Sequence, residues 1–281
     1  MPELPEVETM RRGILGAKGA TVLRLRNCRC KKKPLKMNLP FSTIARRLKN
    51  RKLVELDRHG KRLILKFQGD WAMVIEPRMT GLMLVNDPPT QEHMRFEFEL
   101  QGGEHEQIGF WDRRGLGQVF LLDQAGLAEY LSPKRIGPDA TTITAEQLRT
   151  NLKDRKIAVK VGLLDQKAIA GVGNIYASEI LHLCGIDPRR RCNKISKKDW
   201  DLVHEKTLLV METAIRAEGS TLSDGTYRTA LNDPGNYQNE HRVYDRQGLN
   251  CPTCSVGKIQ KVVQAQRSTY FCNKCQKTIG R

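Results

Sequence analysis

The second half of this 281-residue chain contains the stretch Leu163-Leu-Asp-Gln-Lys-Ala-Ile-Ala-Gly171-Val-Gly173-Asn174-Ile-Tyr-Ala-Ser-Glu-Ile-Leu181, which has the pattern of two helices joined by a glycine-containing turn. Gly171 and Gly173 allow a tight turn and the close approach of another backbone. Asn174 stands where an N-cap residue begins a helix, and the free amides of a helix N-terminus can bind phosphate. The residues alone fit a phosphate-binding turn between two helices and a plain helical hairpin equally well.

Further helical patterns surround this stretch. Pro133 to Thr144 is rich in proline, threonine and glycine, which is typical of a linker between domains. From Gly219 to about Gln238 the chain lacks a periodic pattern, which predicts a loop. A chain of this length normally forms more than one domain. We expect helices at 146–152, 159–164, 175–184 and 198–217.

The first half of the chain begins with a helical pattern and continues with an alternating one. Residues 4 to about 15 predict a short amphipathic helix, because Pro5 is tolerated in a first turn and Val7, Met10 and Ile14 recur at helical spacing. From residue 21 to about 123, short runs of alternating apolar residues predict an antiparallel sandwich or barrel. The clearest runs are 22–25, 62–67, 95–100 and 118–122.

Positive charge dominates the composition. The chain has 48 Lys and Arg residues against 31 Asp and Glu residues, a formal net charge of +17 and a pI near 9.7. This balance favours a polyanionic partner, nucleic acid first and an anionic membrane second. The sequence contains neither an apolar run of the roughly 20 residues that span a membrane nor a recognisable signal peptide. Basic clusters that widen the electrostatic footprint lie at 31–33, 46–52 and 189–198.

Two cysteine pairs near the C-terminus predict a metal site. Cys251-Pro-Thr-Cys254 and Cys272-Asn-Lys-Cys275 enclose 17 residues, and such pairs on tight turns can close a tetrahedral Zn²⁺ site. Four thiolates leave no open coordination position, so we expect one structural Zn²⁺ that replaces the core of a short module. The pattern suits a reducing cytosol. The other cysteines are expected to be ordinary thiols: Cys28, Cys30, Cys184 and Cys192.

The N-terminus carries the candidate nucleophile. The chain opens Met1-Pro2-Glu3-Leu4-Pro5-Glu6-Val7, and methionine before so small a residue is normally removed. Removal would leave the secondary amine of Pro2, which can attack an electrophilic carbon and form a charged iminium, as a lysine Schiff base does. A lone Met-Pro would otherwise be an ordinary terminus whose prolines start a helix.

The N-terminal block, the glycine-containing stretch and the zinc-finger pattern together resemble the formamidopyrimidine-DNA glycosylases, which excise oxidised purines and then cut the DNA strand. The resemblance implies an α+β multidomain protein with DNA held in a basic cleft between its domains. It implies an N-terminal β-sandwich domain with the catalytic helix, a helix–two-turn–helix domain and a C-terminal zinc-finger hairpin, which we expect at 2–133, 134–240 and 241–281.

The resemblance also implies roles for residues near the reaction. Pro2 would be the nucleophile, Glu3 the general acid/base at the sugar ring, and Glu6 a supporting residue one turn later. Lys61 is similar to a family lysine that touches phosphate and assists elimination. Asn174 and Arg267 match family residues that bind backbone phosphate.

Three further residues would fill the gap that the extruded nucleotide leaves in the duplex. They are Met79, Arg114 and Leu116, where the last replaces the family phenylalanine. The family segment Asp-Pro-Arg-Arg-Phe-Gly appears here as 112–117, Asp-Arg-Arg-Gly-Leu-Gly, and Glu76-Pro77 replaces a common His-Leu. Trp111 is an alternative wedge or a core residue. These departures leave recognition of the base opposite the lesion open.

Two other functions remain possible from the sequence. An endonuclease VIII-type glycosylase for oxidised pyrimidines is a relative, but such chains usually begin Pro-Glu-Gly-Pro-Glu, so Leu4 favours the purine enzymes. The departures at Leu116 and Glu76-Pro77 give some weight to a second alternative, a non-enzymatic lesion-binding protein of the same fold. In each case we expect a monomer in the bacterial cytoplasm, associated with the nucleoid, with damaged double-stranded DNA as partner and no membrane association.

Overall fold

The computed structural model describes residues 2–85 and 87–277, which form two compact units. The first unit combines Met1–Ser132 with Ala217–Asn236, and the second combines Pro133–Arg216 with Tyr237–Arg281. This division differs from the expected continuous domain at 134–240, because segment 217–236 packs with the first unit. A Cβ on Gly13 would lie 2.3 Å from Ala230 Cβ, so the two backbones approach closely.

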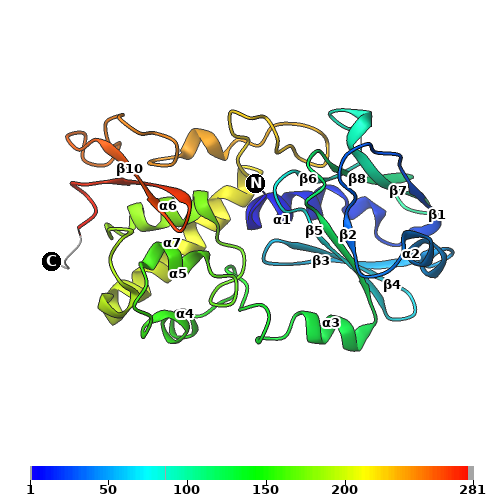
Figure 1. The fold of residues 1–281 in the computed structure, drawn as a ribbon, viewed down its shortest axis with the longest axis horizontal. Helices are drawn as coiled ribbons and strands as arrows, with labels where there is room; N and C mark the ends of the chain where they lie inside the picture. Colours follow the sequence, from blue (N-terminus) through cyan, green and yellow to red (C-terminus); the bar gives the residue numbers. More distant parts are fainter. Residues whose placement is uncertain (1, 86, 278–281) are drawn as a thin grey trace. The chain divides into compact units, whose positions relative to one another are not determined.

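Two β-sheets form the body of the first unit (Figure 1). Phe67 and Phe98, one from each sheet, stack with ring centroids 6.1 Å apart, which confirms the predicted sandwich. One sheet has the order β1 (Thr21–Asn27), β7 (Met94–Gln101), β8 (Gln107–Asp112), β6 (Gly81–Leu84). The other has the order β2 (Lys36–Met37), β9 (Gln118–Leu122), β5 (Trp71–Glu76), β4 (Arg62–Phe67), β3 (Leu53–His59).

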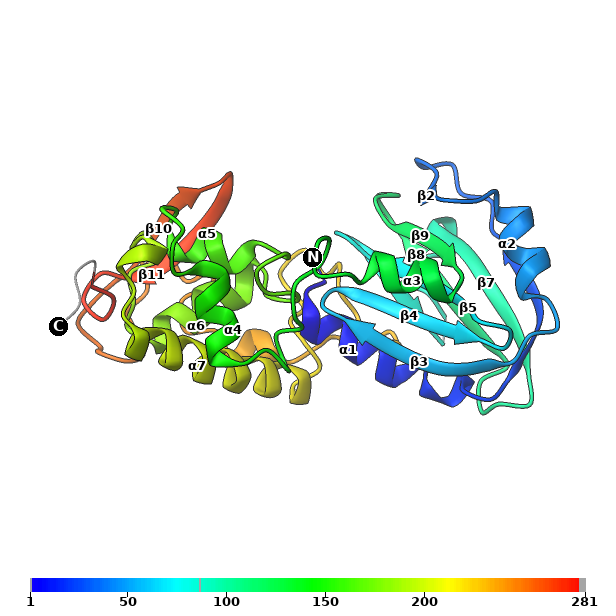
Figure 2. The ribbon, with the colours of Figure 1, turned by 90° about the horizontal axis from the view of Figure 1, so that it is seen from below.

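Helix α1 (Leu4–Gly13) packs against β3, β4 and β6, and Figure 2 shows it running beside β3. Val7, Met10 and Ile14 are fully buried, as their helical spacing predicts. The polar side of this helix is also buried, because Glu8 and Thr9 are only 7% and 6% exposed. The other helical elements of this unit are η1 (Leu15–Ala17), α2 (Phe41–Leu48), η2 (Gln91–His93) and α3 (Gln124–Tyr130).

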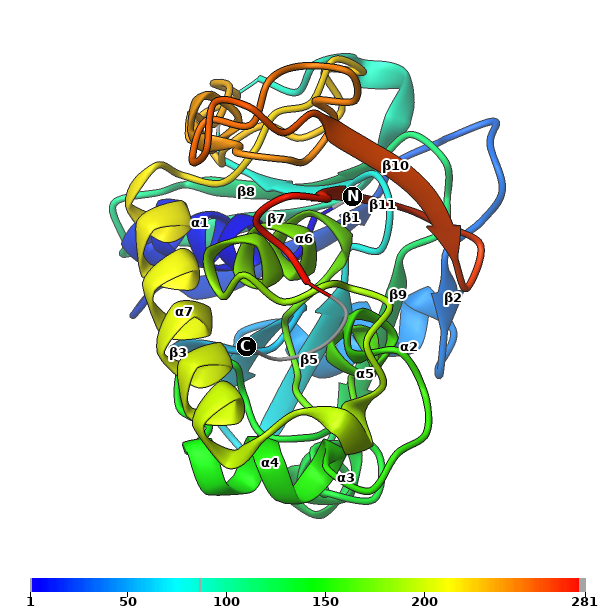
Figure 3. The same ribbon diagram turned by 90° about the vertical axis from the view of Figure 1, so that its left-hand side faces the viewer.

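The second unit joins a helical bundle to a β-hairpin. Helices α4 (Ala145–Leu152) and α6 (Asn174–Leu183) pack on α7 (Lys197–Arg216), and α5 (Val159–Leu164) packs on α6. The hairpin strands β10 (Ile259–Gln264) and β11 (Arg267–Cys272) are antiparallel, and β11 packs on α6 (Figure 3). Two short 3₁₀ helices complete the unit: η3 (Cys192–Lys194) and η4 (Tyr237–Glu240).

The expected helices at 146–152, 159–164, 175–184 and 198–217 are all confirmed within one residue. The unpatterned segment from 219 to about 238 contains no helix or strand before η4. In the described part of the chain, no helix has both the length and the apolar character needed to cross a membrane.

Candidate active site and zinc centre

The segment ahead of α1 is buried and tightly held. Pro2 and Glu3 precede the helix, and Glu3 is only 1% exposed. Glu6 Oε2 accepts a hydrogen bond of 2.7 Å from the backbone N–H of Glu3. Glu6 Oε1 accepts one of 2.8 Å from the backbone N–H of Ser220. One carboxylate therefore fixes the N-terminal segment and the loop that returns to the first unit.

Gly219 makes this arrangement possible. Its φ is +78°, a conformation that favours glycine. A Cβ at this position would lie 2.8 Å from Glu6 Oε1, too close for the carboxylate to stay in place. Glycine at position 219 therefore suits both the backbone conformation of the loop and its close approach to Glu6.

Lys61 lies in the turn between β3 and β4, next to Gly60 with a φ of +56°. Arg58 Nη1 donates to Gly60 O at 3.1 Å, and Arg58 Nε donates to Glu8 Oε2 at 3.1 Å. The turn is thereby tied to α1, which begins directly after the Pro2 segment. The helix and the turn form parts of one packed body.

Glu8 is the electrostatic anchor of α1. Arg11 Nη2 and Arg12 Nε each donate to Glu8 Oε1 at 2.8 Å, in addition to the bond from Arg58. Burial by itself raises the pKa of Glu8, but the bonds from Arg11 and Arg12 and the nearby positive charges outweigh it and lower the pKa to about 2. The carboxylate is therefore ionised at neutral pH and holds the helix against β3.

Met79 and Arg114 meet on the surface of the first unit. Met79, between β5 and β6, is 39% exposed, and Arg114 Nη1 donates to its Sδ at 3.6 Å. Beneath them, Thr80 Oγ1 accepts from the Arg114 N–H at 3.0 Å and donates to the buried carboxylate of Asp112. The two loops are thus joined, and two residues expected to enter the duplex lie side by side.

Leu116 lies in the same loop as Arg114 and is half-buried. Asp112 accepts from the backbone N–H of Arg114 at 3.2 Å and from that of Gly117 at 2.8 Å, so one carboxylate holds both ends of the loop. Trp111 is a core residue, because it is 3% exposed and its indole N–H donates to a backbone carbonyl at 2.8 Å. Leu116 is therefore the apolar side chain that this loop presents.

Glu76, where the family commonly has histidine, is buried in an ion-pair network. Arg62 Nε and Arg78 Nη2 lie 3.2 Å and 2.7 Å from its carboxylate oxygens, and the Tyr130 hydroxyl donates to it. Burial, together with the charge of Glu76, raises the pKa of Tyr130 to about 12. Two guanidinium groups thus neutralise the negative charge of Glu76, and the hydrogen bond from Tyr130 joins α3 to the sheet.

The turn before α6 has the expected glycine geometry. Gly171 has a φ of +113°, and the Gln166 side chain accepts from its N–H at 3.0 Å and donates to Val172 O at 2.9 Å. Gly173 is the N-cap, and Asn174 is the first helical residue. The prediction that Asn174 itself caps the helix is therefore wrong by one position, because its side chain has another partner.

Lys160 is that partner, and sequence reasoning missed it. The side chain is fully buried, and Nζ donates to Asn174 Oδ1 at 2.6 Å, Thr269 Oγ1 at 2.8 Å and Ser268 O at 3.1 Å. These acceptors match the three donors of an ammonium group. The lysine thus links α5, α6 and β11. The only sequence signal is its place in the otherwise apolar run 159–164.

Arg267 begins β11 directly after the hairpin turn, and its side chain is exposed. The turn residues Ala265 and Gln266 have φ values of +45° and +61°. Positive φ at both central positions is typical of a type I′ turn, which usually contains Asn or Gly. The hairpin therefore presents the Arg267 side chain beside its tip, as expected.

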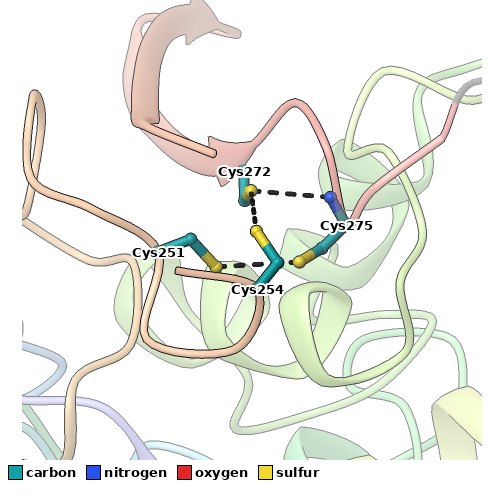
Figure 4. Close-up of side chains that lie close together, drawn as sticks. All are labelled: Cys251, Cys254, Cys272 and Cys275. Atoms are coloured by element: carbon teal, nitrogen blue, oxygen red, sulfur yellow. Dashed lines mark hydrogen bonds between the residues drawn. The ribbon is translucent and has the colours of Figure 1, made fainter. Parts of the chain in front are cut away.

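The four predicted ligands come together at the base of the hairpin (Figure 4). Their sulfur atoms lie within 4.8 Å of one another, with Cys251 Sγ 3.6 Å from Cys275 Sγ and Cys254 Sγ 3.8 Å from Cys272 Sγ. A tetrahedral zinc ion with Zn–S bonds of ~2.3 Å holds its sulfurs ~3.8 Å apart. The cluster therefore fits one structural Zn²⁺.

Glu179 anchors the start of the zinc module on α6. This carboxylate is 1% exposed and accepts from the backbone N–H groups of Arg242, Val243 and Tyr244 at 2.9, 3.0 and 2.8 Å. Three bonds to one buried carboxylate fix the chain at the point where it leaves the helical bundle.

Burial raises the thiol pKa of three of the other cysteines. It raises the pKa of Cys28 to about 12, that of Cys192 to about 11, and that of Cys184 further still. Thiols with such pKa values stay protonated at neutral pH and are weak nucleophiles.

Three domain families match the chain in order. Residues 1–119 match the formamidopyrimidine-DNA glycosylase N-terminal domain, and residues 136–226 match the formamidopyrimidine-DNA glycosylase H2TH domain. Residues 248–278 match the zinc finger found in FPG and IleRS. The three matches cover the sandwich, the helical turn and the cysteine cluster described above.

Curated relatives and solved structures match over almost the whole chain. The formamidopyrimidine-DNA glycosylase of Chloroflexus aurantiacus is 36% identical over 99% of both chains, and that of Pediococcus pentosaceus is 36% identical over 98% of this chain and 99% of its own. The MutM (Fpg) protein of Thermus thermophilus has a TM-score of 0.85 and 31% identity, with both chains fully covered. A Lactococcus lactis Fpg protein in complex with Fapy-dG-containing DNA has a TM-score of 0.86 and 30% identity, covering 98% of this chain and 100% of its own. The chain belongs to the formamidopyrimidine-DNA glycosylase family.

Proposed function

We propose that this protein removes oxidised purines, such as 8-oxoguanine and formamidopyrimidines, from duplex DNA and then cuts the strand as an AP lyase. The observation that carries the proposal is the buried segment of Pro2 and Glu3, where the Glu6 carboxylate holds both the Glu3 backbone and Ser220. Such rigid placement suits a reaction in which the terminal group must reach one sugar carbon. The relatives' names and the Fapy-dG complex of a neighbour support the same substrate class.

The proposed reaction begins at Pro2 once Met1, which lies outside the described residues, has been removed. The Pro2 nitrogen bonds to C1′ of the sugar, the bond from C1′ to the damaged base breaks, and the base leaves with a proton. Glu3 exchanges a proton with the sugar ring as it opens to the iminium. The iminium acidifies the C2′ proton, so the 3′-phosphate and then the 5′-phosphate leave in successive β- and δ-eliminations.

The position of Pro2 ahead of α1 favours the reactive form of its amine. An α-amino group has a reference pKa of about 8, which leaves only about a tenth of it neutral at pH 7. The positive end of the helix dipole disfavours the protonated amine. Both Glu6 oxygens accept backbone N–H bonds, so this carboxylate is held in place beside the Pro2 segment.

The remaining site residues would bind DNA. Lys61 touches phosphate near the reacting sugar, while Asn174 and Arg267 bind the phosphate backbone in the second unit. Met79, Arg114 and Leu116 would enter the duplex in place of the extruded nucleotide, and the contact between Met79 and Arg114 supports their joint action. The Zn²⁺ bound by the four cysteines would stabilise the hairpin that carries Arg267. We further propose that the protein is a monomer in the bacterial cytoplasm, where it acts on nucleoid DNA.

The products of incision test this function. On a duplex with one 8-oxoguanine, the protein should release the base and leave a one-nucleotide gap with phosphate at both ends, while an undamaged duplex stays intact. Pro2→Gly should slow incision by at least tenfold. Faster excision of an oxidised pyrimidine would indicate an endonuclease VIII-type enzyme. Tight lesion binding without any incision would indicate a non-enzymatic lesion-binding protein.

A further inference from the structure

The basic segment 28–36 runs beside the loop 113–117, which carries Arg114 and Leu116. At its start, Cys28 N donates to Arg95 O at 3.0 Å, and at its end Lys36 pairs with Gln118 as β2 joins β9. Both ends of the segment are thus attached to strands next to the loop.

Arg95 joins the segment to the loop at their centres. Arg95 is 5% exposed, and its guanidinium donates to Asp112 O through Nε at 2.8 Å and Nη2 at 2.6 Å, and to Lys33 O through Nη1 at 2.8 Å. Gly115, with a φ of +63°, packs so closely that a Cβ would lie 2.1 Å from Lys33 O. The segment therefore occupies a fixed place against the loop.

In the part of the chain that the structure describes, the segment carries several positive charges that have no carboxylate beside them. It contains five exposed cations, and within the described residues none forms an ion pair with a carboxylate. A hollow of about 590 Å³ opens beside them, lined by four cations and by no acidic residue of the described chain. Cations so crowded repel one another, and a polyanion relieves this repulsion. The five are Arg29, Lys31, Lys32, Lys33 and Lys36.

We propose that segment 28–36 binds phosphates of the undamaged strand, opposite the lesion. This inference rests on the proposed function, in which Arg114 enters the duplex in place of the extruded nucleotide. Arg114 would there face the orphaned base, so the adjoining segment would lie beside the strand that carries this base. The sheet order supports the assignment to the opposite strand. β2 ends the five-stranded sheet at one edge, and the β3–β4 turn with Lys61 lies at the other edge. Four interstrand spacings of ~4.8 Å place β2 and β3 ~19 Å apart, which is comparable to the width of a duplex.

A double-mutant cycle between protein charges and DNA charges tests the proposal. The variant K31Q/K32Q/K33Q removes three exposed cations and leaves the Lys33 carbonyl for Arg95. K194Q/K197Q/K198Q, on exposed positions of the second unit, removes the same charge as a control. Each protein is titrated with abasic-analogue duplexes that carry phosphates or neutral methylphosphonates in the opposite strand at the nucleotides facing the lesion.

Three methylphosphonates should lower the duplex affinity of the wild type and of the control by about tenfold or more. For K31Q/K32Q/K33Q, the same change in the DNA should lower the affinity by less than about twofold. The triple variant should also flatten the log–log salt dependence on duplex by about one unit per lost contact, with little change on single strands. Equal losses from methylphosphonates in all three proteins would overturn the proposal. Borohydride trapping on an abasic duplex at saturating protein separates the two hypotheses: its absence in wild type refutes the proposed function, and its presence in the triple variant shows intact chemistry.

Discussion

The ammonium of Lys160 lies 2.6 Å from Asn174 Oδ1 and is fully buried where α5, α6 and β11 meet. Lys160→Met keeps most of the unbranched apolar stem but leaves the acceptors at Asn174, Ser268 and Thr269 without this donor. Stability should fall by about 1–3 kcal/mol, because unsatisfied buried polar groups are costly. Affinity for abasic duplex should fall about tenfold as Asn174 and the hairpin lose their alignment.

Thermal unfolding and DNA titration of Lys160→Met measure these two effects. Lys156→Met is the matched control, because Lys156 is exposed four residues earlier. Equal behaviour of the two variants would show that Lys160 does not position the DNA contacts.

The zinc module provides a second prediction. Chelation of the metal or Cys272→Ser should unfold the β10–β11 hairpin and abolish DNA binding while the N-terminal sandwich stays folded. Arg267→Ala should keep the zinc content, weaken binding to all DNA sequences alike and lower the salt slope by about one unit. Metal analysis, circular dichroism and titration at several salt concentrations check both variants. Full DNA affinity of the zinc-free protein would contradict this assignment.

The loop that Asp112 holds at both ends provides a third prediction. An apolar side chain can wedge between base steps without being aromatic, but leucine lacks the stacking that is worth roughly 1–3 kcal/mol per base. Leu116→Phe should therefore tighten lesion-duplex binding by up to about tenfold, with little change on single strands. Arg114→Ala should reduce discrimination between cytosine and adenine opposite the lesion.

Excision rates on cytosine- and adenine-opposed substrates check these variants. Trp111→Ala serves as a comparison, because Trp111 is a core residue and its loss should act through stability. If Leu116→Phe has no effect on duplex binding, Leu116 is not the wedge.

The Glu8 cluster predicts a pH dependence of stability. The pKa of Glu8 is lowered to about 2 in the folded state, below its ordinary value of 4.5. The stabilisation is therefore present above pH 4.5 and is lost as the pH falls towards 2. Glu8→Gln should lower the Tm at pH 7, and the difference from wild type should shrink below pH 4.5. Glu55→Gln, at an exposed pair with Lys66, should change the Tm little at any pH. A constant difference for Glu8→Gln across this range would contradict the assignment.

The sequence predicts the parts of the fold that have local signals. The cysteine spacing, the helical runs and the alternating strands each depend on residues close together in the chain, and each is present in the structure. Pro5 and the spacing of Val7, Met10 and Ile14 likewise predict α1.

Other features depend on contacts between distant segments, which no local pattern encodes. Segment 217–236 joins the first unit through the close approach of Ala230 to Gly13. Two partners of Glu76, Arg62 and Tyr130, come from a neighbouring strand and from α3, and the acceptors of Lys160 include a residue of β11. The family resemblance supplied the site residues, but these tertiary contacts explain how the chain holds them.

Covalent trapping identifies the nucleophile of this protein directly. Mature protein, with removal of Met1 verified by intact mass, is incubated with abasic or 8-oxoguanine duplex and borohydride, and the cross-linked peptide is mapped. We expect a reduced adduct on the Pro2 nitrogen, weaker trapping for Pro2→Gly and none when an extra residue precedes Pro2. An adduct on an internal lysine, with the Pro2 amine free, would contradict it.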